Sequence, residues 1–266
     1  MPDSSLVAAQ EGLGATRRQD AWWVAPLLTV LGLTVFAVYV PWAALQPIAY
    51  SEFTKTGTYY LSPFFSPNLR ELLGIEWRFW PFLILWIPGG FRATCYYYRK
   101  AYYRSFFADP PACAVGEPKR NYCGEAKFPF LLQNIHRYFF YGAGIVLAFL
   151  WYDAARAFFF WEQIKGEGVP RYHFGMGVGS LVLLINCICL TGFTFGCNSL
   201  RHLIGGRLDC FTCSAMARTR FKLWNGVTFF NLKHMEWAWV SLFTVGFADL
   251  YIRLCAMGIW TDFRIF

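Results

Sequence analysis

Long apolar stretches constrain the fold of this chain more than any other feature of its sequence. A helix of about 20 apolar residues crosses a hydrocarbon core that is roughly 30 Å thick. Stretches of this kind recur at about 22–46, 77–98, 136–160, 174–200 and 235–258. Irregular loops and open strands leave backbone groups unpaired in lipid, so each stretch is expected to form a helix. The sequence therefore predicts an all-α integral membrane bundle of five transmembrane helices.

The composition agrees with a membrane protein and argues against an additional soluble domain. Apolar residues make up 56% of the chain and charged residues only 15%, whereas a soluble domain has about a quarter charged residues. The sequence shows no internal repeat and no low-complexity tract. We therefore expect a single transmembrane domain that covers residues 1–266.

The distribution of cations predicts the orientation of the bundle. The loop between the second and third stretches contains Arg99, Lys100, Arg104, Lys119, Arg120 and Lys127, and the loop between the fourth and fifth contains Arg201, Arg207, Arg218, Arg220, Lys222 and Lys233. The opposite loops contain only Lys55, Arg70, Lys165 and Arg171. Because cytoplasmic loops are enriched in Lys and Arg, the N-terminus is expected in the cytoplasm and the C-terminus outside. The net charge of +8 is thus a topology signal and does not indicate nucleic-acid binding.

Histidines and cysteines gather at the ends of the predicted helices. The chain has 4 histidines and 9 cysteines, and most of them lie at or near the predicted cytoplasmic surface: His136, His202, His234, Cys95, Cys113, Cys123, Cys197, Cys210 and Cys213. Soft thiolates beside imidazoles suit an iron–sulfur cluster, zinc or haem iron. A disulfide is the least expected use of these thiols, because the cytoplasm is reducing.

Three kinds of protein fit this gathering. A Rieske-type [2Fe–2S] centre would use two cysteines and two histidines. A haem b would use two histidines on facing helices, and only one such haem fits because His173 stands alone near the outer side. A structural or transport protein would use the same side chains for packing, as we expect for the mid-helix residues Cys187, Cys189 and Cys255.

Other residues suggest local structure. Cys210 and Cys213 have a C-x-x-C spacing that could bind zinc or be redox active. Asp153 with Arg156, and Asp249 with Arg253, have helical spacings that allow ion pairs late in two spans. The aromatic and basic run 95–104 suggests an interfacial helix end, or a docking surface or the mouth of an apolar ligand site.

The chain resembles a bacterial membrane-anchor subunit of succinate dehydrogenase (respiratory complex II). The resemblance is to the five-helix, single-subunit type, which carries a membrane-embedded Rieske-type [2Fe–2S] cluster in place of haem. It runs from about residue 77 to 258 and rests on residues 94–99, 110–115, 136–141, 201–208 and 234–239.

The resemblance implies a multi-pass anchor in the bacterial cytoplasmic (inner) membrane, bound to a flavoprotein subunit and an iron–sulfur subunit. FAD and further iron–sulfur clusters belong to those partners, and so does the succinate site, since this chain contains no catalytic residue for the dicarboxylate. Electrons would pass through this chain to a quinone, either menaquinone or ubiquinone. Association of the complex into a higher oligomer, the type of quinone and the direction of turnover stay open.

The resemblance also implies a ligand set for the cluster. The first choice is Cys95 and Cys113 with His202 and His234, and the reserves are His136 and Cys197. The related pattern tends to have a second cysteine where this chain has Leu200. For the quinone, location alone suggests Tyr97, Arg99, Arg137, Tyr138 and Trp237. A haem b anchor of the same complex is the alternative cofactor assignment.

Overall fold

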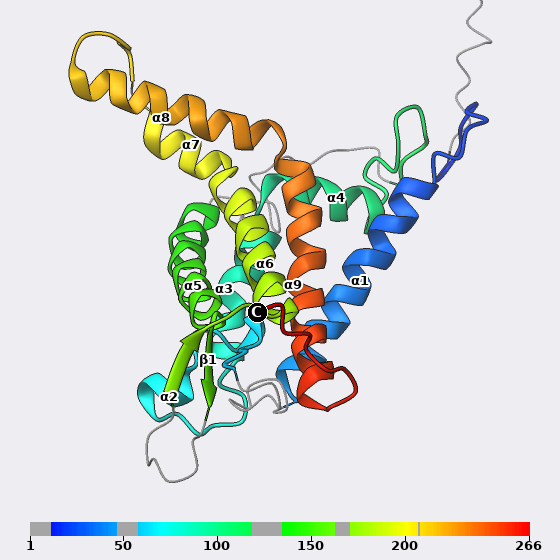
Figure 1. Cartoon of the computed structure of the whole chain (residues 1–266). Helices are drawn as coiled ribbons and strands as arrows, with labels where there is room; N and C mark the ends of the chain where they lie inside the picture. Colours follow the sequence, from blue (N-terminus) through cyan, green and yellow to red (C-terminus); the bar gives the residue numbers. More distant parts are fainter. Residues whose placement is uncertain (1–11, 47–57, 119–134, 163–170, 207) are drawn as a thin grey trace, which may run out of the picture. The chain divides into compact units, whose positions relative to one another are not determined.

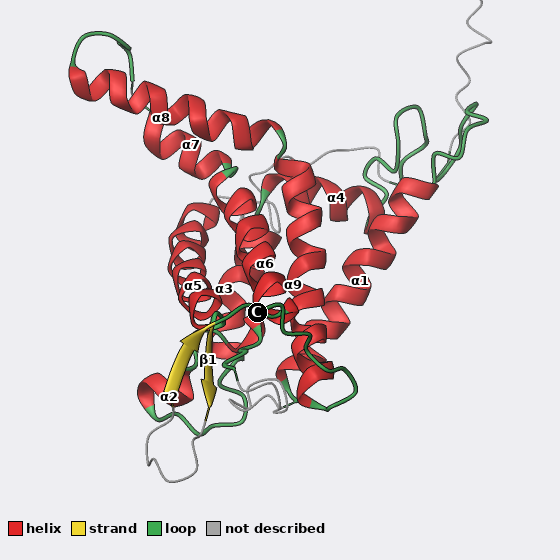
Figure 2. Ribbon diagram, viewed as in Figure 1, coloured by secondary structure: helices red, strands yellow, loops and turns green. Residues whose placement is uncertain are grey.

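A computed structural model describes residues 12–46, 58–118, 135–162, 171–206 and 208–266. Cys123 and the predicted loop cations Lys55, Lys119, Arg120, Lys127, Lys165 and Arg207 lie outside these residues. The described part is mostly helical, with one small two-stranded sheet and several loops (Figure 2). It falls into two compact units, one formed from residues up to 38 and from 92 to 136, the other from 39–91 and 137–266.

Four helices are long and apolar enough to cross a membrane: α1 (Val24–Ala44), α5 (His136–Arg156), α6 (Val178–Phe195) and α9 (His234–Ala256). They correspond to the first, third, fourth and fifth predicted stretches, which confirms the predominantly helical membrane character. The second stretch was predicted too long, because its helix α3 (Phe82–Ala93) has only 12 residues. Residues 77–80 form a turn, and at the other end Cys95 is extended and begins a new helix.

The larger unit is built around α6 and α9, which pack against each other along their lengths (Figure 1). Small side chains recur on the buried side of α9 at Ala238, Ser241 and Ala248. Such residues let two membrane helices approach closely, so that dispersion contacts hold them together. On α6, Gly192 provides the matching space, since a Cβ there would lie 2.5 Å from the ring of Trp237.

A cap of short elements closes one end of this unit. Strands β1 (Phe159–Glu162) and β2 (Arg171–Phe174) pair antiparallel, with Phe160 opposite His173. The cap also contains the 3-10 helix η3 (Pro63–Phe65) and the helix α2 (Leu69–Leu73). The carboxylate of Asp262 accepts hydrogen bonds from the hydroxyls of Tyr60 (2.7 Å) and Tyr251 (2.6 Å) and from the backbone N–H of Gly179 (2.8 Å). Asp262 thereby joins the C-terminal segment to the first turn of α6.

The two predicted ion pairs have different outcomes. Asp249 and Arg253 form a buried ion pair on α9, as their spacing suggested. Asp153 and Arg156 do not pair. Arg156 instead contacts Glu71 of α2 at 3.4 Å, while Asp153 accepts a hydrogen bond of 2.6 Å from Ser66. The reason is burial, because Asp153 lies on the buried side of α5 whereas Arg156 reaches the cap.

The smaller unit contains the first part of α1, the helix α4 (Tyr96–Phe106) and the segment 107–118. The start of the chain is joined to this segment by backbone hydrogen bonds between Gly14 and Gly116 and between Gly116 and Ala15. The guanidinium of Arg18 donates to the carbonyl of Cys113 at 2.9 Å. Residues 96–104 of the aromatic and basic run lie in the helix α4, and Cys95 is its N-cap.

The segment between α6 and α9, expected as a loop, forms a helical hairpin of α7 (Asn198–Gly205) and α8 (Ala215–Leu232) (Figure 1). Cys210 and Cys213 in its turn are joined by a disulfide. The expectation that a disulfide was the least probable use of these thiols was wrong in this structure, since the turn brings the two Cα atoms to 5.8 Å. That distance lies in the usual range for a disulfide.

Candidate functional site

One cysteine and one histidine are neighbours in the smaller unit. Cys95 is buried at the N-cap of α4, and the residue before it, Thr94, is also buried. The hydroxyl of Thr94 lies 2.9 Å from Nδ1 of His136, the first residue of α5. This contact holds the imidazole beside the backbone that carries Cys95. A hydrogen bond of this kind fixes the orientation of a ligating histidine in many metal sites.

A second cysteine and histidine are neighbours in the larger unit. Cys197 is buried at the N-cap of α7, and the residue before it is Gly196. A Cβ on Gly196 would lie 3.2 Å from Nδ1 of His234 and 2.8 Å from the carbonyl oxygen of Gly192. Only glycine therefore lets His234 approach this turn of the backbone. The imidazole of His234 is also stacked on Phe193, with ring centroids 5.0 Å apart.

The two pairs arise from the same local design. In each, an apolar helix ends, one residue follows, and an extended cysteine begins a surface helix, with ψ of 131° at Cys95 and 138° at Cys197. An N-cap position places a sulfur near backbone N–H groups, which favours negative charge. At Cys197 the N–H of Ser199 donates to the sulfur at 3.3 Å. Burial nevertheless raises the pKa of the Cys197 thiol above its ordinary value.

The other two first-choice ligands are more exposed. Cys113 lies in the segment after α4, with an exposed side chain, and Ala114 next to it has a positive φ of 57°. His202 is exposed on α7. Leu200, where the related pattern has a cysteine, lies half-buried on the same helix.

Thiols and imidazoles are the donor types that a mixed thiolate and imidazole site would use. In the described part of the chain, however, no three histidine, cysteine, aspartate or glutamate side chains form a group that could hold a metal ion. The structure thus shows cysteine–histidine neighbours within each unit and no coordination geometry.

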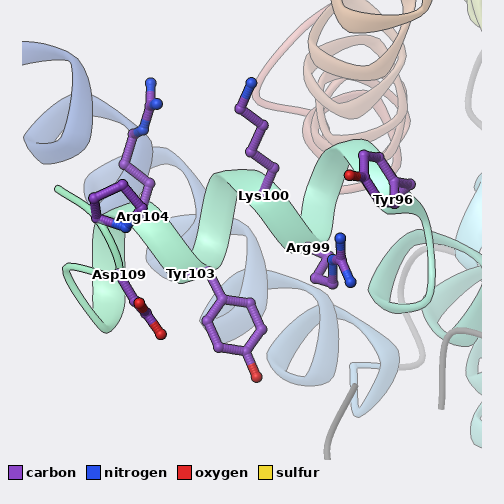
Figure 3. Close-up of a pocket in the computed structure, with 7 residues that line it drawn as sticks. Tyr96, Arg99, Lys100, Tyr103, Arg104 and Asp109 are labelled. Carbon is purple, nitrogen blue, oxygen red and sulfur yellow. The ribbon is translucent and has the colours of Figure 1, made fainter. Parts of the chain in front are cut away.

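The suggested quinone residues lie in several places. Arg99 lines a cavity of about 150 Å³ beside α4, and its guanidinium stacks 4.3 Å from the ring centre of Tyr96 (Figure 3). Tyr97 lies on the same helix, with its ring 5.8 Å from that of Tyr98. Arg137 and Tyr138 are exposed in the first turn of α5.

Trp237, the last of these residues, packs against Gly192 inside the larger unit. The other side chains that line the cavity are mostly basic or aromatic: Tyr96, Lys100, Tyr103, Arg104, Asp109 and Pro110. Of the five suggested quinone residues, Arg99 alone is among those that line this cavity.

Sequence reasoning missed two positions that organise these neighbours. Thr94 was part of the motif 94–99 but received no role, and Gly196 was not considered. In both places a residue with a hydroxyl group or no side chain directly precedes a cysteine at the junction of two helices. This pattern predicts a contact with a histidine only when the position of that histidine in the fold is known.

Comparisons with known proteins agree with this architecture. The sequence profile of the family described as actinobacterial succinate dehydrogenase subunit SdhC matches residues 24–258. Among solved structures, the chain is similar to one from the Mycobacterium smegmatis Sdh1 complex in the apo form. The two share 40% sequence identity with a TM-score of 0.79, and the match covers 94% of each chain. Among curated protein sequences, none matches at a significant level.

The profile match covers most of the chain, and the four long apolar helices fit a protein that crosses the bacterial inner membrane several times. As a membrane subunit of succinate dehydrogenase it works with the flavoprotein and iron–sulfur subunits, and the succinate site is on a partner. This chain belongs to the actinobacterial SdhC family of succinate dehydrogenase membrane subunits.

Proposed function

We propose that this subunit passes electrons from the iron–sulfur subunit to a quinone through a membrane-embedded Rieske-type [2Fe–2S] cluster. Two cysteines and two histidines would ligate the cluster. They are drawn from Cys95, Cys113, Cys197, His136, His202 and His234. When bound, the cluster supplies one-electron redox chemistry, and histidine ligation raises its potential above that of a four-cysteine cluster.

The observation that supports this proposal is the occurrence of one buried cysteine beside one histidine in each unit. Thr94 holds His136 next to Cys95, and Gly196 admits His234 next to Cys197. Within its own unit each of these pairs offers one thiol and one imidazole as candidate ligands, whereas Cys113 and His202 of the first choice have exposed side chains. A Rieske-type centre needs two thiols and two imidazoles, and the candidates include three of each.

The residues around each proposed ligand have defined tasks. The hydroxyl of Thr94 orients the His136 ring and selects which of its nitrogens is available. Phe193 covers one face of His234 and excludes water from that side. Removing water and fixing the rings in advance lowers the reorganisation that a redox change requires.

For the quinone we propose a site that uses Tyr97, Arg99, Arg137, Tyr138 and Trp237. Phenol, guanidinium and indole groups can all donate hydrogen bonds to a quinone carbonyl. Menaquinone and ubiquinone both present such carbonyls.

We further propose that the chain is a single anchor domain that crosses the membrane five times. The second crossing would contain α3, the N-terminus would lie in the cytoplasm and the C-terminus outside.

Four single histidine variants of the intact complex test the cluster. His136→Ala and His234→Ala are expected to abolish its electron paramagnetic resonance signal and quinone reduction. Succinate oxidation with an artificial acceptor should continue, because that chemistry belongs to the partner subunits. His173→Ala, on the exposed strand β2, is the matched control and should behave as wild type.

His202→Ala decides between the ligand sets. Loss of the signal in this variant, with retention in His136→Ala, would restore the first choice derived from the resemblance. Quinone reduction that survives in all four variants would contradict the cluster itself. An optical spectrum of the reduced complex adds an independent check, since a haem band would favour the haem b alternative. Iron analysis showing only the iron of the partner subunits would favour a structural role.

A further inference from the structure

The cavity beside α4 carries more positive charge than the proposed quinone site requires. Its cations are Arg99, Lys100 and Arg104. Asp109 is the one carboxylate among the described residues that line it, so the lining has a net charge of +2. Like charges gathered around one small cavity repel one another unless an anion lies among them. The lining therefore favours a negatively charged ligand over a neutral quinone.

The helical repeat of α4 brings two of these cations together. Lys100 and Arg104 are four residues apart, which is close to one turn, and Figure 3 shows both side chains extending to the same side of α4. Two like charges at this spacing weaken a helix. An anion bound by both side chains would offset their repulsion.

The side chains of Lys100 and Arg104 have no anionic partner in the part of the chain that the structure describes. Neither takes part in an ion pair there, although Asp109 lines the same cavity. The Nε atom of Arg104 is buried and lacks a hydrogen-bond partner among the described residues. Leaving a buried donor unpaired is costly, so an acceptor bound to this guanidinium would stabilise the cavity.

Contacts within the smaller unit place the cavity close to the membrane surface. The hydroxyl of Thr16 donates to the carbonyl of Ala114 at 2.7 Å, and Arg18 donates to the carbonyl of Cys113. These bonds tie the segment after α4 to the residues just before α1, whose apolar span begins at Val24. Because the same segment supplies part of the cavity wall, the cavity lies near the level at which α1 enters the membrane.

An exposed apolar surface adjoins the cavity. The ring of Tyr103, which lines the cavity, lies 5.2 Å from the ring of Phe107, and the side chain of Phe107 is 51% exposed. Phe106, the last residue of α4, is 48% exposed. Such a surface can pack against lipid acyl chains, whereas a free phosphate ion would make no use of it. The combination of cations and exposed rings therefore fits a phospholipid.

We propose that this cavity binds the phosphate group of an anionic phospholipid, with Lys100 and Arg104 as its ligands and the acyl chains against Phe106 and Phe107. A guanidinium can bind a phosphate through two parallel hydrogen bonds, while an ammonium acts as a point charge. An engineered cavity of about 150 Å³ binds benzene, so the similar volume here has room for a phosphate group. Basic pockets of membrane proteins recognise anionic headgroups in this way. The proposal does not depend on the cluster or on the quinone site, because neither assigns a role to Lys100 or Arg104.

Native mass spectrometry of the intact complex measures the bound lipid. The complex is reconstituted in nanodiscs that contain phosphatidylcholine and phosphatidylglycerol, and the phosphatidylglycerol that stays bound after detergent extraction is counted. The double variant Lys100→Gln with Arg104→Gln removes both proposed ligands. Each membrane-surface cation contributes about a fivefold preference for an anionic lipid, so the retention of phosphatidylglycerol relative to phosphatidylcholine should fall by about 25-fold. Equal retention in the double variant and the wild type would refute the site.

Two further double variants separate the role of the charges from a loss of structure. Arg78→Gln with Lys222→Gln removes two exposed cations outside the cavity and should retain as much phosphatidylglycerol as the wild type. Lys100→Arg with Arg104→Lys keeps both charges in the cavity and should also retain the lipid. An equal loss in the Arg78 and Lys222 control, or in the variant that keeps the charges, would contradict the assignment of Lys100 and Arg104 as phosphate ligands.

Two more measurements distinguish the phospholipid from other anions. Inorganic phosphate in excess should not displace the retained phosphatidylglycerol, because it lacks the acyl chains that pack on the exposed rings. Complete displacement would show that the cavity takes free phosphate instead. Carbodiimide treatment of the complex should leave Lys100 without a crosslink to the partner subunits. A crosslink from Lys100 to a carboxylate of the iron–sulfur subunit would overturn the proposal, since a protein carboxylate would then occupy the place of the phosphate.

Discussion

The guanidinium Nε of Arg253 lies 3.3 Å from the carboxylate of Asp249, one helical turn earlier on α9, and both side chains are buried. Asp249 also accepts hydrogen bonds from Tyr39 at the end of α1 and from Ser62 near η3. Arg253 additionally donates to the carbonyl of Ala43 at 3.0 Å. The ion pair therefore joins α9 to the end of α1 and to the segment before η3.

Asp249→Asn should strongly destabilise the protein. The substitution keeps the shape of the side chain but leaves the charge of Arg253 buried without its counterion. Loss of one partner of a buried pair costs about 3–5 kcal/mol. Thermal unfolding of the purified complex measures the effect. Glu76→Gln, at an exposed carboxylate, should change little, and an equal loss in both variants would contradict the role of the pair.

Two glycine substitutions should have opposite effects. Gly192→Ala would place a Cβ 2.5 Å from Trp237, whereas a Cβ on Gly144 of α5 would have no atom within 4 Å. Overpacking costs about 1–3 kcal/mol, while alanine is a better helix residue than glycine by about 1 kcal/mol. Gly192→Ala should lower the unfolding temperature of the complex, and Gly144→Ala should maintain or raise it. A destabilised Gly144→Ala variant would show that the helix interior is more crowded than these contacts indicate.

Asp262→Ala should loosen the cap beside α6. The change removes the acceptor for the hydroxyls of Tyr60 and Tyr251 and for the N–H of Gly179. Leaving a buried polar group unpaired costs about 1–3 kcal/mol. Tyr251→Phe removes one of these bonds together with its donor and should have a smaller effect. Hydrogen exchange of the first turn of α6 reports the loss directly, and unchanged protection there would contradict the capping role.

Thr94 should act as a positioning residue for His136. Thr94→Val removes the hydroxyl at nearly constant volume, and Thr94→Ser retains it. Second-sphere changes of this kind reduce metal affinity or activity by about 10–100-fold. If His136 is a ligand, the valine variant should alter the electron paramagnetic resonance signal and slow quinone reduction, and the serine variant should restore both. Identical spectra in the two variants would argue that Thr94 only packs against the ring.

Cys210 and Cys213 should resist alkylation until a reductant is added. Their disulfide predicts that the peptide containing both residues is unmodified after denaturation with iodoacetamide alone. The exposed thiol of Cys113 should be modified under the same conditions and serves as the internal control. Mass spectrometry of the digested complex makes the measurement. Alkylation of both residues without reductant would show that the pair is reduced in the isolated protein.

Much of the helical architecture is predictable from sequence because it depends on local properties. The apolar stretches that became α1, α5, α6 and α9 are recognisable without knowing any partner, since a membrane span must satisfy its own backbone hydrogen bonds. The placement of Cys95, His136 and His234 at or next to helix ends is likewise a local property. The Asp249 and Arg253 pair is local too, because both groups lie on one helix.

Other features depended on which segments pack together. The sequence placed Asp153 beside Arg156, yet Asp153 is buried and bonds to Ser66, whereas the half-buried Arg156 pairs with Glu71. The stretch between the predicted spans 174–200 and 235–258 was expected to be a basic loop, and the packing of Trp224 on Gly205 and the hydrogen bonds of Arg220 hold α7 and α8 together there as a hairpin.

By itself the sequence determined that this chain is a helical membrane protein and where its thiols and imidazoles lie along the helices, because hydropathy and helix ends are local properties of the chain. Only the tertiary structure decided that Thr94 holds His136 and that Gly196 admits His234. Those contacts join residues more than 35 positions apart in the sequence (42 for Thr94 and His136). Their formation depends on the packing of whole helices, which no local pattern specifies.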